Sequence, residues 1–349
     1  MLTGRGLVFV DANRCEVEEV HIDEANLLPG QVAIETECSV VSAGTEVANF
    51  TGLDPGTRRA GSWNVYPWRP GYGAIGRIVA LGPSLPETEG RYALDDRVFA
   101  VSSHARYAIA EAAHRPVVPI GVDDDARTMI LARMASVAIT AVRKATNTSL
   151  GGTAVVIGLG LVGNFAAQLF QLGGTRVLGL DRSESRVKMA EATGITAMRV
   201  DEATGRDSVL SALGAEDGAD IVIEASGVPD AVFFALEVAA AGGEVILLGS
   251  PRGAMRGDAT ELLSDIHHRG IRIIGALEWL LPLRSGPWQA RWSLVEDYLM
   301  LFQLFRQGRI TTTGLVTEVV GPEQAQETYS RLAQNGPSMG GVLFDWTAG

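Results

Sequence analysis

The sequence contains little cysteine. Its 349 residues include two, Cys15 and Cys38, and no CxxC pair. A disulfide framework and a four-thiolate zinc lobe both need more cysteines, so the sequence excludes them. Basic residues are also outnumbered: 29 Lys and Arg stand against 41 Asp and Glu, the net charge is −12, and no local Lys/Arg cluster stands out. We therefore expect neither nucleic acid nor an anionic membrane surface as a partner.

A membrane span is not predicted either. Residues 154–172 carry no charge, but three glycines and three amide side chains interrupt them. A strand, a turn and a helix explain this stretch better than a span does. The first residues, MLTGRGLVFV, have neither the length nor the cleavage pattern of a signal peptide. The default expectation is a cytoplasmic protein.

Residues 1–138 are predicted to form a β-rich domain. Short runs that alternate apolar and polar residues are broken by Pro and Gly, a pattern typical of a half-exposed antiparallel barrel or sheet. These runs are GLVFV, CEVEEVHI, QVAIETECSVV, AIGRIVALG, DRVFAV and RYAIA. The pattern changes after residue 138, and a chain of this length suggests two domains, each with its own core.

Residues 139–277 are predicted to form a parallel α/β domain. The apolar strands are TAVVI, RVLGL, DIVIEA, EVILLG and RIIGA, with helical periods between them. Helices are expected at Asn164–Leu172, Ser185–Ala192 and Pro229–Ala241, and the last of these begins with Pro and ends at a Gly pair. Uniformly apolar strands joined by helices indicate a sheet covered on both faces.

Residues 278–349 are expected to return to the first domain, which would make that domain discontinuous. They show no repeat or linker character. Two helices, near Ser293–Gln307 and Glu323–Gln334, and a last strand, GVLFDW, are predicted there.

Two segments match the GxGxxG pattern, which is weak evidence by itself. GYGAIG, residues 71–76, leads into a strand, so we interpret its glycines as turn residues with no helix N-terminus to meet a phosphate. GLGLVG, residues 158–163, lies between a predicted strand and a predicted helix, the context of a dinucleotide-binding turn. Its first glycine allows the tight turn, the second lets a pyrophosphate approach, and the third lets the helix pack closely. The predicted cofactor-binding residues here are Gly158, Leu159, Gly160, Leu161, Val162 and Gly163.

Asp181 ends the next strand, 18 residues beyond Gly163. An acid there accepts hydrogen bonds from the ribose hydroxyls of NAD and repels a 2′-phosphate, so NAD is favoured, although the adjacent Arg182 leaves NADP possible. Helix N-capping before SESRVKMA is the alternative role of this acid. The loops EASG and LLGSPRG are interpreted as facing the cofactor, with ordinary strand-ending turns as the alternative. The remaining cofactor candidates are Arg186, Ala225, Ser226, Gly227, Gly249, Ser250 and Leu277.

The chain resembles the medium-chain dehydrogenase/reductase superfamily along nearly its whole length. PGYGAIGRIVALG is similar to the family's PGHE-x-x-G-x-V-x-x-G block, LDDRVFA to its GDRV strand, ASVAITAV to the segment entering the Rossmann domain, and GVLFDW to its closing strand. The resemblance implies an α/β fold with a Rossmann doubly wound parallel sheet, residues 139–277, and a discontinuous GroES-like catalytic domain, residues 1–138 and 278–349. It also implies a homodimer, with the strand RIIGAL at Arg272–Leu277 as a candidate for pairing between subunits.

Zinc-dependent members of that superfamily hold zinc with a Cys in an early turn, the His and Glu of PGHE, and a Cys ahead of the Rossmann domain. At these positions the sequence has Ser42, Tyr72, Gly73 and Ser136. Hydroxyls and a glycine cannot replace thiolate and imidazole as zinc ligands. The chain therefore resembles a zinc-free branch, similar to bacteriochlorophyllide dehydrogenase-like and polyol or cyclitol dehydrogenase-like proteins, and no metal is expected.

Without a metal, hydrogen-bond donors must stabilise a developing alkoxide. The candidates are Ser42 and Thr45 in the turn VVSAGTE, Tyr72, and His104 in SSHARY. His104 is the attractive acid/base because His titrates near pH ~6.5 and Tyr near pH ~10. The alternatives are a surface-loop role for His104 and a space-filling role for Tyr72. Glu46 is expected to accept backbone N–H bonds in the turn rather than a proton.

Five of the six tryptophans lie in two stretches outside the Rossmann half, GSWNVYPWRP and EWLLPLRSGPWQARW. Aromatic walls suit flat apolar ligands and the C–H faces of sugar or cyclitol rings, and ordinary packing is the alternative. An arginine nearby could bind an acidic group of the substrate. The predicted substrate contacts are Trp63, Trp68, Trp279, Trp288 and Arg291.

These features favour an NAD-dependent, zinc-independent oxidoreductase that interconverts a secondary alcohol and a ketone on a cyclitol, sugar or similar ring. An NADPH-dependent enone or quinone reductase is one alternative, although its relatives usually have a looser AxxGxxG turn. A dinucleotide-binding sensor or structural protein without catalysis is another. The expected partners are a small-molecule substrate and a second copy of the chain.

Overall fold

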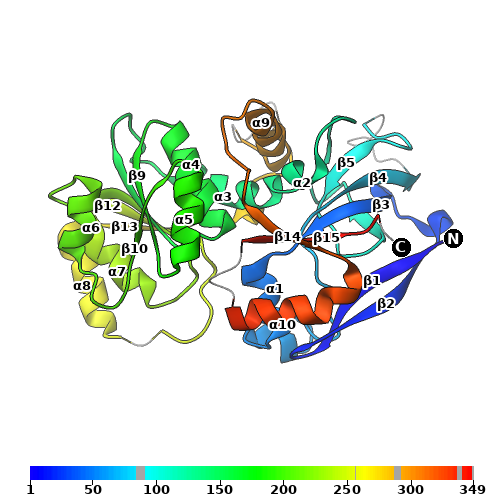
Figure 1. Cartoon of the computed structure of the whole chain (residues 1–349), viewed down its shortest axis with the longest axis horizontal. Helices are drawn as coiled ribbons and strands as arrows, with labels where there is room; N and C mark the ends of the chain where they lie inside the picture. The colour runs from blue at the N-terminus through cyan, green and yellow to red at the C-terminus, as the bar shows by residue number, and fades with distance from the viewer. Residues whose placement is uncertain (84–90, 256, 287–291, 336–339, 348–349) are drawn as a thin grey trace.

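The computed structural model describes residues 1–83, 91–255, 257–286, 292–335 and 340–347. Figure 1 shows two lobes side by side along the longest axis, one built on a six-stranded sheet and the other on a seven-stranded sheet. Within the described ranges, no helix is both long and apolar enough to cross a membrane.

The six-stranded sheet is parallel, with the strand order β10-β9-β8-β11-β12-β13. The predicted doubly wound sheet is therefore confirmed. The central strand β8 is buried along its whole length, as its uniformly apolar sequence predicts. The strands are β8 (Thr153–Ile157), β9 (Arg176–Asp181), β10 (Thr196–Arg199), β11 (Ala219–Glu224), β12 (Ala239–Leu247) and β13 (Arg272–Gly275).

Helices α4 to α8 lie against this sheet (Figure 1). The sequence predicts a helix over Pro229–Ala241, whereas the observed helix, α7, ends at Val238. From Ala239 the backbone pairs with Ala219 of β11, and this sheet pairing overrides the helix propensity of the alanines. The helices are α4 (Leu161–Leu172), α5 (Glu184–Ala192), α6 (Arg206–Leu213), α7 (Ala231–Val238) and α8 (Ala259–Arg269).

The seven-stranded sheet joins the beginning and the end of the chain. β15 (Gly341–Asp345) pairs antiparallel with β3 (Gln31–Val40) and parallel with β14 (Val316–Val320). The C-terminal part thus completes the N-terminal lobe. The other strands of this sheet are β4 (Ala74–Leu81), β5 (Arg97–Ala100), β6 (Tyr107–Glu111) and β7 (Val117–Pro119), and β1 (Leu2–Asp11) and β2 (Arg14–Ile22) form a separate hairpin.

Helices join the two lobes and cover the second sheet. Residue 138, the predicted end of the first domain, lies inside α3 (Ala132–Lys144), which contacts both α4 and α9 (Leu294–Arg306). The other helices are α1 (Ala43–Phe50), α2 (Ala126–Met129) and α10 (Ala325–Asn335), with short 3-10 helices η1 (Glu24–Asn26), η2 (Pro55–Arg58), η3 (Glu278–Leu280) and η4 (Pro322–Gln324).

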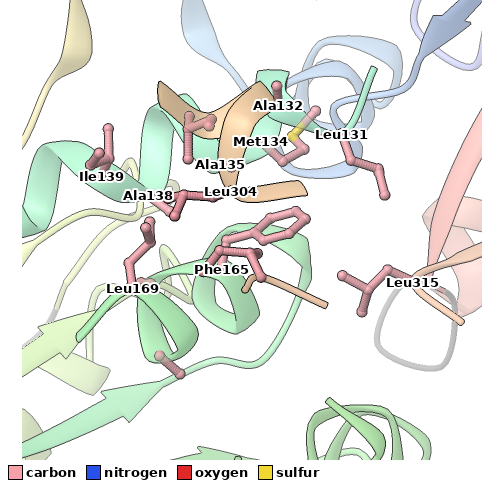
Figure 2. Close-up of a cluster of buried hydrophobic side chains, with 14 of the residues drawn as sticks. Leu131, Ala132, Met134, Ala135, Ala138, Ile139, Phe165, Leu169, Leu304 and Leu315 are labelled. Atoms are coloured by element: carbon pink, nitrogen blue, oxygen red, sulfur yellow. The ribbon is translucent and has the colours of Figure 1, made fainter. Parts of the chain in front are cut away.

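The largest hydrophobic core lies where α3, α4 and α9 meet (Figure 2). Ile139 of α3, Phe165 of α4 and Leu304 of α9 are all buried in it. The rings of Phe165 and Phe305 lie 5.9 Å apart. Because this core takes side chains from both lobes, it holds them in one orientation.

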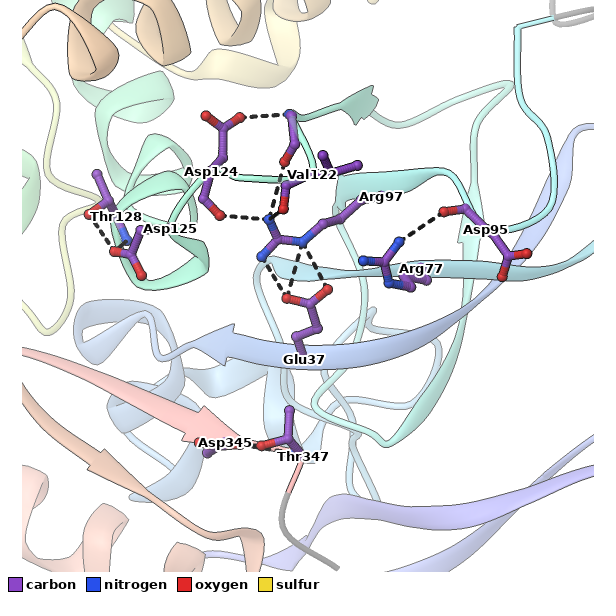
Figure 3. A network of polar contacts seen from close by, with 11 residues as sticks. Glu37, Arg77, Asp95, Arg97, Val122, Asp124, Asp125, Thr128, Asp345 and Thr347 are labelled. Carbon is purple, nitrogen blue, oxygen red and sulfur yellow. Dashed lines mark hydrogen bonds and ion pairs between the residues drawn. The ribbon is translucent and has the colours of Figure 1, made fainter.

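A polar network anchors the loop before α2 (Figure 3). The buried guanidinium of Arg97 on β5 forms a forked pair with Glu37 of β3, at 2.9 and 2.7 Å. It also donates to the carbonyl of Asp124, whose carboxylate accepts from Arg306 of α9 at 2.5 Å. Forked arginine pairs of this kind fix direction as well as distance. The network therefore ties β5 to α9 on the side of the sheet that faces the other lobe's helices.

The shared core gives a stability prediction on one helix. We expect Leu301→Ala, which truncates a side chain with 0% exposure, to lower the free energy of unfolding by about 2–5 kcal/mol through the cavity it leaves. Leu299→Ala on the same helix removes a side chain that is 49% exposed and should change that free energy by about 0.5 kcal/mol or less. Urea denaturation of both variants checks this, and equal losses would contradict the assigned core.

Candidate cofactor site and active site

The turn between β8 and α4 has the backbone that a dinucleotide-binding loop needs. Gly158 has φ +93°, and a Cβ there would lie 2.8 Å from the backbone nitrogen of Ser226. A Cβ on Gly163 would lie 1.8 Å from the carbonyl oxygen of Gly158, so the helix packs directly on the turn. Gly160 is the N-cap and makes no side-chain capping bond, which leaves the first N–H groups of the helix for an anion.

Three strand ends meet beside this turn, where the strand order reverses between β8 and β11. A Cβ on Gly227 would lie 2.6 Å from the carbonyl oxygen of Ser250, and one on Gly249 would lie 2.4 Å from the nitrogen of Gly227. The loops EASG and LLGSPRG therefore pack on each other, and the first also packs on Gly158. In contrast, GYGAIG leads into β4, as predicted, so its glycines shape a turn.

Asp181 is buried at the end of β9 and holds the turn. Its carboxylate accepts from the N–H of Leu159 at 2.7 Å and from the N–H of Ser183 at 2.8 Å. Ser183 is the N-cap of α5, so the N-cap alternative for Asp181 is wrong. A carboxylate has about four acceptor positions, which leaves capacity for ribose hydroxyls.

The two arginines after Asp181 differ in position. Arg186 lies 3.8 Å from the carboxylate and is the nearest side chain to the open face of Gly160. Burial lowers the pKa of Arg186, and the neighbouring carboxylate opposes that shift. The side chain of Arg182 is 74% exposed and pairs with Glu202 at 3.5 Å. Leu277, predicted at the nicotinamide edge, follows β13 and is exposed.

Ser42 lies at the start of a helix rather than in the turn that the sequence predicts. Its N–H donates to the carboxylate of Glu46 at 2.9 Å, one helical turn later, and this contact stabilises the first turn of α1. The prediction that Glu46 accepts a backbone N–H is thereby confirmed. Glu46 is buried and also accepts from the hydroxyl of Tyr329 at 2.5 Å.

His104 is buried within the same network. It is 0% exposed, with Nδ1 2.7 Å from the hydroxyl of Ser39 and Nε2 3.0 Å from Glu46. Both the surface-loop alternative and the prediction of direct acid/base contact are therefore wrong, because neither ring nitrogen can reach a substrate. The sequence could not show this, since the partners of His104 lie on β3 and α1.

The remaining candidates lie at the junction of the lobes. The ring of Tyr72, just before β4, covers the guanidinium of Arg133, with 3.7 Å between its centroid and the arginine Cζ. Arg252, from the loop after β12, donates to the carbonyl of Gly44 and to the hydroxyl of Thr45, at 3.2 Å in the second case. Sequence reasoning missed both arginines, although Arg252 lies in the loop LLGSPRG that it selected.

The tryptophans do not gather at this junction. Trp63 and Trp68 form a T-shaped pair, and Trp68 packs on Phe9 of β1. Trp279, in η3, lies near the junction, with the guanidinium of Arg133 5.2 Å from its ring and that of Arg115 4.1 Å away. The predicted contacts Trp288 and Arg291 lie outside the described residues.

Comparison with known proteins agrees with this architecture. Residues 162–292 match the family model described as zinc-binding dehydrogenase. D-guloside 3-dehydrogenase of Shigella flexneri is 24% identical over 348 residues, covering 93% of this chain and 96% of that protein. The structure superposes on benzyl alcohol dehydrogenase from Acinetobacter calcoaceticus with a TM-score of 0.80 at 15% identity, covering 99% of both chains. Galactitol-1-phosphate dehydrogenase from Escherichia coli gives 0.79 at 17% identity, with 98% of this chain and 99% of that chain covered.

The whole chain has the fold of the medium-chain dehydrogenase/reductase superfamily. The superfamily's cofactor is NAD(P), and the turn after β8 with Asp181 fits a dinucleotide. The donor set for zinc does not fit: hydroxyls stand at three of the four ligand positions, and glycine at the fourth. Within the described residues, no group of three or more His, Cys, Asp and Glu could hold a metal. A side chain at Gly73 would also meet Phe99 at 2.9 Å.

Asp181 gives a prediction about cofactor choice. We expect Asp181→Asn to bind NADH about 10- to 100-fold more weakly, the range for losing hydrogen bonds to a charged group, and to bind NADPH no less tightly because the repulsion is gone. Asp220→Asn is the matched control, since Asp220 also accepts a backbone N–H, from Thr153, but lies at the opposite end of the sheet. Fluorescence titration measures both, and unchanged NADH binding in Asp181→Asn would contradict the assignment.

His104 gives a prediction about stability. We expect His104→Ala to lower the free energy of unfolding by about 1–3 kcal/mol, because it leaves the buried Glu46 without one donor. NADH binding should be unchanged. The exposed His114→Ala is the control, and urea denaturation that fails to separate the two variants would show that the network contributes no stability.

Proposed function

We propose that this protein is a medium-chain dehydrogenase/reductase: an NAD-dependent, zinc-independent enzyme that interconverts a secondary alcohol and a ketone on a ring-containing polyol or sugar. The observation that carries the proposal is the pairing of two features across the lobes. One is a dinucleotide turn closed by Asp181, and the other is a metal-ligand set replaced by hydroxyl donors, with Tyr72 at its centre. A carboxylate at the ribose favours NAD over NADP.

The substrate class rests on the relatives and on the side chains at the junction. One relative is a dehydrogenase of D-gulosides and one structural neighbour is a dehydrogenase of galactitol 1-phosphate, both carbohydrate derivatives. Tyr72 and Trp279 are each partly exposed, and the face of an aromatic ring suits the C–H face of a sugar. An enone or quinone reductase is less favoured, because Gly158, Gly160 and Asp181 form a tight turn suited to NAD.

The chemistry needs a group that exchanges a proton with the substrate oxygen. Nicotinamide supplies or accepts the hydride. In reduction, hydride adds to the carbonyl carbon while Tyr72 gives its phenolic proton to the oxygen, and oxidation reverses both transfers. Burial raises the pKa of Tyr72, so the phenol is protonated at neutral pH and can donate. This donor is lost as the pH rises through that elevated pKa. The hydroxyls of Ser42 and Thr45 are the further candidates for holding the oxygen.

We also propose a homodimer. β13 forms one edge of the six-stranded sheet, and Ile273, on that edge, is 39% exposed. Leu277 and Leu280 just beyond it are 52% and 67% exposed. A second copy of this edge would cover them. Sedimentation velocity of the full chain tests the oligomeric state.

A spectrophotometric screen tests the activity. NAD and NADP are each combined with cyclitols, alkyl glycosides, simple alcohols and enones, and the zinc content of the same sample is measured. We expect turnover with NAD and a glycoside or cyclitol, unchanged after treatment with a chelator. Stoichiometric zinc would overturn zinc independence. Turnover restricted to NADPH and enones would identify a reductase, and tight NAD binding without turnover would identify a sensor or structural protein.

Tyr72 gives a kinetic prediction. We expect Tyr72→Phe to lower kcat by about 10²- to 10⁴-fold, the range for removing a general acid, with little change in KM. Tyr107→Phe is the control, because it removes the same hydroxyl from a tyrosine that bonds to Glu35 on the second sheet. Steady-state kinetics checks both variants, and a kcat for Tyr72→Phe equal to that of the control would remove Tyr72 from the reaction.

A further inference from the structure

Arg133, the second residue of α3, is a fully buried charge at the junction of the lobes. It is 0% exposed and is among the largest fully buried side chains. A buried charge is costly unless it is paired and hydrogen-bonded. Glu278 of η3, 3% exposed, accepts from its two terminal nitrogens at 2.5 and 2.8 Å, a forked pair. The hydroxyls of Ser136 and Tyr298 complete the surroundings of one of these nitrogens, at 2.8 and 3.2 Å.

Tyr72 is held at two points by this guanidinium. Its ring lies on the guanidinium face, and its carbonyl accepts from Nε of Arg133 at 2.9 Å. The first contact sets the plane of the ring and the second sets the backbone that carries it. Because Glu278 follows β13, the contacts of Arg133 with Tyr72 and Glu278 connect the start of β4 in one lobe to the sheet of the other. Turning the phenol away would remove its ring from the guanidinium face.

Arg133 also explains the residues that stand at the superfamily's metal-ligand positions. Tyr72 stacks on it, and Ser136 bonds to it. A Cβ on Gly73 would lie 3.1 Å from the Arg133 side chain, so the arginine uses the space that a ligand there would need. Three of the four positions therefore border the side chain of Arg133: Tyr72 and Ser136 contact its guanidinium, and Gly73 leaves room for its methylene groups. The altered ligand set and the buried arginine are a single packing arrangement.

We infer that Arg133, locked by Glu278, is the positioning residue of this active site: it orients Tyr72 as the proton donor and supplies the fixed positive charge beside it, in place of a metal. The inference rests on the proposed function. Arg133 acts through Tyr72, because the ring separates its buried guanidinium from any substrate. Its effect is therefore expected on the chemical step and on the ionisation of Tyr72.

The charges around Tyr72 predict the direction in which each substitution changes the pKa of Tyr72. Burial raises the pKa of Tyr72, and Arg133 lowers it. Glu278 and Glu46 raise it, and Arg252 lowers it. Removing Arg133 must then move the phenol titration to higher pH, and removing the charge of Glu278 must move it to lower pH. A residue that only stabilises the fold would not produce shifts of opposite sign.

The experiment compares Arg133→Met, Arg133→Lys and Glu278→Gln in the full chain. Tyrosinate absorbance is recorded after rapid pH jumps, before unfolding, and the Tyr72→Phe difference isolates Tyr72. We expect a higher titration for Arg133→Met, a lower one for Glu278→Gln, and an intermediate position for Arg133→Lys. We also expect kcat of Arg133→Met to fall about 10- to 100-fold with KM nearly unchanged, as for losing a charged hydrogen-bonding partner.

The matched control is Arg143→Met. Arg143 lies on the same helix, pairs with the buried Asp297 at 2.6 Å and covers the ring of Trp292 at 3.5 Å, but it does not contact Tyr72. Its loss should leave kcat and the titration of Tyr72 unchanged.

Arg133→Met can fail to fold, because it leaves Glu278 buried without its partner. The double variant Arg133→Met/Glu278→Met removes both charges and should restore stability, since apolar side chains often replace a buried ion pair without loss. We expect kcat of the double variant to stay low. Recovery of kcat together with stability would show a structural role and overturn the inference.

Two outcomes separate this inference from the proposed function. If the wild-type chain turns over a substrate, and neither kcat nor the titration of Tyr72 differs between Arg133→Met and Arg143→Met, the inference fails alone. In the second outcome no substrate is turned over, but the titration of Tyr72 shifts in opposite directions in Arg133→Met and Glu278→Gln. The positioning of Tyr72 by Arg133 is then supported, and the dehydrogenase assignment fails.

Discussion

The ion pair between Arg133 and Glu278 is the interaction on which the junction of this protein depends. A charge that is 0% exposed is tolerable only if its partners are fixed, and fixing them constrains three segments at once. α3 carries the arginine, η3 carries the carboxylate, and Tyr72 lies on the guanidinium face. Through Tyr72 the same pair connects the parallel sheet to the start of β4, so it acts together with the shared hydrophobic core in setting the relative position of the two lobes, and it also sets the position of the Tyr72 ring.

Two other arrangements complete the site around that pair. On the cofactor side, three strand ends converge so closely that only glycine fits at Gly158, Gly227 and Gly249, and a buried carboxylate holds the backbone of the turn. On the other side, Glu46 takes the N–H of Ser42 and two ring-borne donors, which makes the start of α1 rigid. Both arrangements hold backbone in place, which leaves the side chains at the junction free to meet a substrate.

Much of the fold could be predicted because its signals are local. The strand TAVVI and the helix capped by Ser293 occur where apolar pattern and capping residue place them. Where the secondary structure differs from the sequence prediction, contacts between distant segments are the cause. β10 has no continuous apolar run, and it exists because β9 offers it a partner. Ala239 favours helix by composition but pairs with Ala219 of β11, and the residues after Ser42 form a helix because a buried acid caps them.

The sequence by itself determined the dinucleotide turn, the acid at the end of the following strand, and the residue types at the former metal positions, because each depends on neighbours along the chain. Tertiary structure decided which side chains meet at the junction of the lobes. Arg133 and Glu278 are 145 residues apart, and Arg252 and Thr45 are 207 apart. It also removed His104 from the candidate site by burying both ring nitrogens in bonds to other strands and helices. Contacts over such separations depend on how the sheets and helices pack, and no local pattern encodes that packing.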